Sequence, residues 1–101
     1  MERKIKFVGN AVKWFDKVNG NTYHSVRITK CKTGEQIACQ FQYGYGEQYR
    51  YTALEAMSKA KWIPTGYRDG PNQYMYEREN NYPIAWSVSD GSKRAMIDNG
   101  K

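Results

Sequence analysis

The side chains that most often carry chemistry are few in this chain. It has one histidine, His24, and two cysteines, Cys31 and Cys39, among 101 residues. The alternation of apolar and polar residues over 22–29 and 36–43 predicts His24 and Cys39 on the core side of a sheet and Cys31 on the opposite side. These three side chains therefore cannot close a tetrahedral zinc site. A Cys39–His24 nucleophile pair would be buried, so we expect His24 to be a hydrogen-bonded core residue.

Carboxylates are no better placed for catalysis. They are scattered singly along the chain. The one close pair, Glu77 and Glu79, is predicted on one face of a strand, and we expect this pair to be solvated and not catalytic. The chain contains no P-loop lysine motif. We expect a protein that is not an enzyme and that has no catalytic residue, metal or cofactor. A small enzyme without a recognisable motif is the alternative.

A short glycine turn precedes a predicted helix. It consists of Gly44, Tyr45 and Gly46, and Arg50 follows it. Backbone amides at a helix N-terminus attract phosphate, so these four residues form a candidate anion-binding site. Tyr49 stands where a dinucleotide fingerprint needs its third glycine, so a plain strand-to-helix turn explains the pattern equally well. The functional alternative is sequestration of a small nucleotide signal.

Charge gives a broader indication of the partner. The formal net charge is +6, and residues 3–32 carry eight Lys or Arg but a single acid, Asp16. Basic and acidic residues balance over positions 33–101, with eight of each. Such asymmetry favours an anionic partner for the first third of the chain.

The first three predicted strands place cations, aromatic rings and amides together on their outer face. Bases stack on aromatic rings while lysine and arginine contact phosphates, so this face predicts binding of nucleic acid or a nucleoprotein complex. An acidic protein patch would suit the same surface. Alternatively, a second layer of the fold covers this face, and its side chains have only a structural role. The candidate residues are Lys6, Lys13, Phe15, Tyr23, Arg27, Gln40 and Gln42.

The strands themselves are predicted from alternation. Residues 22–29 and 36–43 alternate, and a two-residue loop at Thr33-Gly34 would pair Ile28 with Cys39 and Val26 with Phe41. The apolar side chains Ile37, Cys39, Phe41 and Tyr43 then face the core.

The first strand needs a device to keep its apolar residues on one side. A bulge at Gly9 would bring Ile5, Phe7, Val12 and Trp14 to the core face. A bulged turn with Gly20 left-handed would set Trp14 opposite His24, and Lys13 would point outward.

The remaining elements complete an α+β fold in a single domain, residues 1–101. Helix-forming residues predict one central helix over 47–61. Alternation predicts strands over 73–78 and 84–88, and residues 93–97 suit either a third strand or a short helix capped by Ser92. The sheet is predicted to be antiparallel, with three N-terminal strands and then two or three more.

Nothing in the sequence predicts a membrane partner. It has no run of about 18 apolar residues, and residues 1–6 lack the apolar core of a secretory signal. We expect a cytoplasmic protein with reduced thiols.

Three stretches carry a resemblance: residues 14–27, Thr33-Gly34-Glu35, and residues 41–46. Over about residues 11–63 the chain resembles small uncharacterised proteins encoded by bacteriophages and prophages. The resemblance implies a mobile-element accessory protein acting in the host cytoplasm. Small phage proteins of this kind include inhibitors of host defence such as anti-CRISPR proteins, so a nucleoprotein defence complex is the expected partner.

Overall fold

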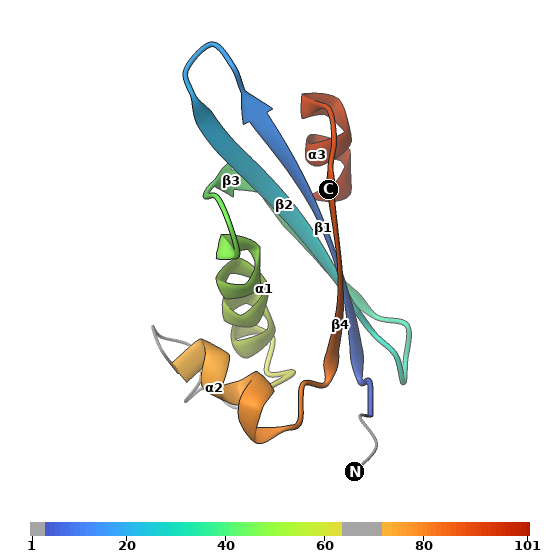
Figure 1. The fold of residues 1–101 in the computed structure, drawn as a ribbon. Helices are drawn as coiled ribbons and strands as arrows, with labels where there is room; N and C mark the ends of the chain where they lie inside the picture. The colour runs from blue at the N-terminus through green and yellow to red at the C-terminus, as the bar shows by residue number, and fades with distance from the viewer. Residues whose placement is uncertain (1–3, 64–71) are drawn as a thin grey trace.

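A computed structural model of the chain describes residues 4–63 and 72–101. Within these ranges the fold is α+β, with one mixed sheet of four strands in the order β3-β2-β1-β4 and three helices (Figure 1). The elements are β1 (Phe7–Asp16), β2 (Asn21–Lys30), β3 (Gln36–Tyr43), α1 (Gln48–Lys59), α2 (Asn72–Glu79), β4 (Ile84–Asp90) and α3 (Lys93–Asn99). The predicted α+β class is confirmed. The sheet is mostly antiparallel, as predicted, but β4 pairs parallel to β1. The predicted single helix and five or six strands are wrong, because residues 73–78 and 93–97 lie in α2 and α3, and four strands form in the described ranges.

The sheet is covered on both faces, by different helices. Helices α1 and α2 lie on one face, and α3 lies on the other (Figure 1). Most of the core is under α1 and α2, and Leu54 and Met57 of α1 are fully buried against Val26 and Ile28 of β2. The face under α3 buries less, chiefly Met96. The end of the sheet that α3 does not reach is therefore exposed on that face.

The β1–β2 hairpin differs from the predicted register by one residue. Asp16 pairs with Asn21, so four residues form the loop, and Trp14 lies opposite Tyr23 rather than His24. The Asp16 carboxylate accepts hydrogen bonds from the backbone N–H groups of Val18 and Asn19, which fixes a turn around Asp16. Gly20 is left-handed, with φ +70°, as predicted.

This register needs no bulge at Gly9. The β1–β2 pairing is continuous from Phe7 to Asp16, so odd-numbered residues of β1 face α1 and even-numbered residues face α3. Trp14 therefore leaves the predicted core face. Lys13, predicted to point outward, lies opposite His24 on the α1 side.

The β2–β3 pairing contains a bulge between the His24 and Val26 pairs, which the alternation of the sequence does not indicate. Val26 pairs with Cys39 and Ile28 with Ile37, so the predicted two-residue loop and its Ile28–Cys39 pair are wrong. The register then shifts by one residue before the His24–Gln42 and Tyr23–Tyr43 pairs. The extra residue reverses the orientation of the strand beyond it. Tyr43 therefore shares the α3 side with Tyr23 instead of the core side.

Residues 73–78 are helical, not extended as predicted. They lie in α2, where adjacent Tyr76 and Glu77 are both buried. A strand would send these neighbours to opposite faces, whereas a helix lets both pack inward. Asn81 and Tyr82, both with positive φ, then reverse the chain before β4.

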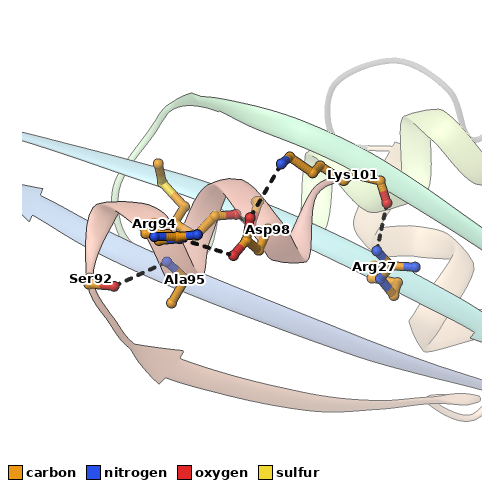
Figure 2. Close-up of polar contacts among 8 residues, drawn as sticks. Arg27, Ser92, Arg94, Ala95, Asp98 and Lys101 are labelled. Carbon is orange, nitrogen blue, oxygen red and sulfur yellow. Dashed lines mark hydrogen bonds and ion pairs between the residues drawn. The ribbon is translucent and has the colours of Figure 1, made fainter.

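The C-terminal segment takes the helical option. The Ser92 hydroxyl accepts a hydrogen bond from the Ala95 N–H at 3.1 Å and caps α3 (Figure 2). No helix in the described ranges is long and apolar enough to cross a membrane.

Candidate functional site

Aromatic side chains form a row across three neighbouring strands on the α3 side of the sheet. Trp14 of β1 stacks on Tyr23 of β2, with ring centroids 5.8 Å apart. Tyr23 meets Tyr43 of β3 edge-on at 6.0 Å, and Phe41 edge-on at 6.4 Å. We call these four residues the aromatic row. Cross-strand registers bring Trp14, Tyr23 and Tyr43 together, so the sheet itself fixes their spacing.

The row is open to solvent at its β3 end. Phe41 is 46% exposed and Tyr43 is 59% exposed, whereas Trp14 and Tyr23 are half-buried. The Lys93 ammonium lies 5.6 Å from the centroid of the Trp14 ring, at the start of α3. A row with exposed rings at one end and a cation at the other is suited to a ligand that has both flat apolar groups and negative charge.

The predicted partner-binding residues do not form one surface. Tyr23 belongs to the aromatic row. Lys13, Phe15 and Gln42 are on the α1 side, because each lies in register with, or two residues from, a residue of that face. The Lys13 ammonium lies 5.4 Å from the centroid of the Tyr49 ring, and Phe15 is 54% exposed at the hairpin end.

Arg27 lies on the α3 side, but its guanidinium is engaged by the protein. Its Nη2 donates to the main-chain oxygen of Lys101 at 2.6 Å (Figure 2), and its Nε donates to the Asn99 carbonyl at 3.3 Å. Its Nη1 donates to Gln36 Oε1 at 3.0 Å. These contacts indicate that Arg27 holds the end of α3 on the sheet.

The two remaining candidates lie apart from each other. Gln40 is exposed at the β3 bulge and precedes Phe41 in the chain, so it borders the aromatic row. Lys6 precedes β1 and is exposed at the far end, where its backbone N–H donates to the Pro83 carbonyl. The structure therefore separates Lys6 from the aromatic residues with which the sequence grouped it.

The glycine turn borders a hollow of about 470 Å³ next to Tyr43. Its lining residues are Tyr43, Gly44, Tyr45, Glu47, Gln48 and Tyr51. Arg50 is not among them. Its Nη1 lies 3.8 Å from a Glu47 carboxylate oxygen and 3.9 Å from one of Glu77. Glu47 lines the hollow, and Arg50 already lies beside two carboxylates, so a phosphate bound there would compete with them for the guanidinium.

His24 is a core residue, as predicted. Its Nδ1 donates to the Gly44 carbonyl, 3.1 Å away, and its Nε2 is 2.8 Å from the Thr52 hydroxyl. A carbonyl oxygen only accepts, so the neutral ring carries its proton on Nδ1 and accepts from Thr52 at Nε2. Burial, with a smaller contribution from Lys13, lowers the pKa of His24 below its ordinary value.

The two cysteines differ in environment. Cys39 is buried, and burial together with the Glu55 carboxylate raises the pKa of its thiol to about 11. Cys31 is exposed at the β2–β3 turn. In the described part of the chain, no three His, Cys, Asp or Glu side chains cluster as a metal site would require.

Trp14, Phe41, Tyr43 and Lys93 are the site residues that sequence reasoning missed. The bulge expected at Gly9 placed Trp14 in the core, and unbroken alternation placed Phe41 and Tyr43 there. Asp16, a residue favoured at the first position of a type I turn, was the available signal for the four-residue loop and the Trp14–Tyr23 pair. No local signal marks the β3 bulge. Comparisons with protein-family models, with curated proteins and with solved structures find no match.

Proposed function

We propose that this protein is a non-enzymatic binding protein and that the aromatic row binds single-stranded nucleic acid. The observation that carries this proposal is the cross-strand series Trp14–Tyr23–Tyr43 with Phe41 beside it. Aromatic side chains on a sheet surface stack unpaired bases, and each stacked base contributes roughly 1–3 kcal/mol. Bases in a duplex are already stacked on one another and do not offer these faces.

Charge supports the same ligand. The net charge of +6 raises the local concentration of an anionic strand, and Lys93 puts a cation at the Trp14 end of the row. Arg94, which follows on α3, has a side chain that is 92% exposed. Bases would then stack at the Phe41 and Tyr43 end while phosphates meet the cations of α3.

The resemblance to phage and prophage proteins extends the proposal to its setting. A guide RNA, or a target strand opened by a host defence complex, presents the unpaired bases that the row requires. Under this proposal a basic protein inhibits by covering nucleic acid, and not by imitating it.

Fluorescence anisotropy with labelled 20-nucleotide single-stranded DNA and RNA, and with a duplex of the same sequence, tests the ligand class. Binding to the single strands should be tighter than to the duplex and should weaken as salt rises. Equal binding to duplex and single strands would contradict base stacking. Failure to bind any nucleic acid, together with binding to an acidic peptide, would support the acidic protein patch instead.

A further inference from the structure

A second basic feature lies at the opposite end of the sheet from the aromatic row. A hollow of about 650 Å³ is formed where the chain enters β1 and where it leaves β2. Its lining residues are Lys4, Ile5, Lys6, Phe7, Lys30, Cys31 and Lys32. We call it the lysine hollow. Figure 1 shows the start of β1 beside the β2–β3 turn, at the end of the sheet away from the β1–β2 hairpin loop.

The two segments are fixed to each other by the backbone. The Cys31 N–H donates to the Lys6 carbonyl at 3.0 Å, and the Phe7 N–H donates to the Pro83 carbonyl at 3.1 Å. The chain at Lys6 and the chain at Cys31 are therefore held side by side by the main chain.

The charge of the hollow is unbalanced. Four lysines line it, and none of its lining residues is acidic. Only Lys30 has a carboxylate nearby, at 3.8 Å from Glu35, and its ammonium also lies 4.7 Å from the centroid of the Trp62 ring. Within residues 4–63 and 72–101, no ion pair involves Lys4, Lys6 or Lys32. Like charges around one hollow repel, and a multivalent anion relieves that repulsion.

We propose that the lysine hollow binds a small ligand with several phosphate groups, of the kind presented by tripolyphosphate or a nucleoside triphosphate. Its volume lies within the range of about 300–1,000 Å³ that is usual for small-molecule pockets. Lysine binds phosphate as a point charge, so lysines from two segments suit a chain of phosphates better than a single one. This inference is independent of the function proposed for the aromatic row.

Isothermal titration with sodium tripolyphosphate tests the site, using a matched pair of variants. Lys6→Gln with Lys32→Gln removes two charges from the hollow, and Lys17→Gln with Lys59→Gln removes two exposed charges elsewhere. Loss of one charge contact worth about 1 kcal/mol weakens binding about fivefold. The hollow variant loses two such contacts, so its affinity for tripolyphosphate should fall roughly 25-fold. The affinity of the control variant should fall by less than about twofold. Equal losses in the two variants, or no binding by the unmodified protein, would overturn the proposal.

Two further arms identify the ligand and separate the sites. ATP should bind more tightly than tripolyphosphate if the nucleoside contacts Ile5, which is 37% exposed, and equally if only phosphates are bound. Phe41→Ala should leave tripolyphosphate binding unchanged. A parallel loss of tripolyphosphate and oligonucleotide binding in that variant would contradict a separate site. Circular dichroism melts confirm that each variant is folded.

Discussion

The indole ring of Trp86 in β4 packs directly on Gly9 of β1, its partner in the parallel strand pair. A Cβ added at Gly9 would lie 2.5 Å from Cε3 and 2.6 Å from Cζ3 of that ring. Trp86 also donates from Nε1 to the buried Glu77 carboxylate at 2.8 Å. The absence of a side chain at Gly9 therefore lets β4 and α2 meet the rest of the sheet.

Gly9→Ala should destabilise the fold by about 1–3 kcal/mol, because a rigid ring must move to admit the methyl group. Chemical denaturation measures the change in the free energy of unfolding. Ser87→Ala, at an exposed position of β4, is the control and should change it by less than about 0.5 kcal/mol. Unchanged stability in Gly9→Ala would contradict the Trp86 packing.

Glu77 joins three elements, since its carboxylate accepts from Trp86 of β4 and lies 3.9 Å from Arg50 of α1. Its side chain is only 3% exposed. Glu77→Ala would remove the acceptor of the Trp86 N–H and should lower the free energy of unfolding by about 1–3 kcal/mol. This loss is smaller than that expected on breaking a fully buried ion pair, because Arg50 is partly solvated. Arg78→Ala, at an exposed position of the same helix, should lower the free energy of unfolding clearly less. Equal thermal shifts in the two variants would be inconsistent with this bridge.

Stability should fall as the pH is lowered below about 6.5, the ordinary pKa of histidine. Burial lowers the pKa of His24 in the folded protein, so the unfolded chain takes up a proton there first. Stability due to the neutral ring is complete above the unfolded-state pKa, and it declines as pH falls from there toward the lowered folded-state pKa. Urea unfolding at pH 7.5, 6.5 and 5.5 checks this. His24→Gln should flatten the profile over that interval, and an equally steep profile in the variant would assign the effect to other groups.

Arg27→Ala should loosen α3, because it removes the donors to Asn99, Lys101 and Gln36. Hydrogen exchange of residues 93–99 should accelerate more than exchange in β2. Arg94→Ala is the control, since Arg94 is largely exposed and pairs only weakly, at 4.0 Å, with Asp98. Loss of oligonucleotide binding in Arg27→Ala with α3 exchange unchanged would instead make Arg27 a ligand contact.

Local sequence signals predicted correctly those elements whose conformation follows from the intrinsic preferences of their own residues. The helix expected over 47–61 is α1, within two residues at each end, because alanine, leucine and methionine favour helix there. The left-handed conformation of Gly20 and the β4 strand were also predicted correctly, although the register of the hairpin was not. Residues 73–78 failed because burial of the neighbours Tyr76 and Glu77 against other elements outweighs their strand-like alternation.

The site was harder to predict than the elements, because it depends on registers. Tyr23 was correctly placed on the outer face, but its neighbours Trp14 and Tyr43 were placed in the core. The bulge expected at Gly9 put Trp14 on the core face, whereas continuous pairing from Phe7 to Asp16 puts it on the α3 side. One bulge in β3, which was not expected, moves Tyr43 to that side. Whether a strand contains a bulge depends on its pairing with the neighbouring strand, which local alternation does not encode.

The most direct test of the aromatic row compares two phenylalanines at opposite faces of the same sheet. Phe41 is 46% exposed in the row, and Phe15 is 54% exposed on the α1 side. The dissociation constant of each alanine variant for a labelled single-stranded oligonucleotide is measured at one salt concentration. We predict that Phe41→Ala weakens binding by about 1–3 kcal/mol, while Phe15→Ala leaves it within about 0.5 kcal/mol of the unmodified protein. Equal effects, or a larger loss in Phe15→Ala, would contradict the aromatic row as the binding surface.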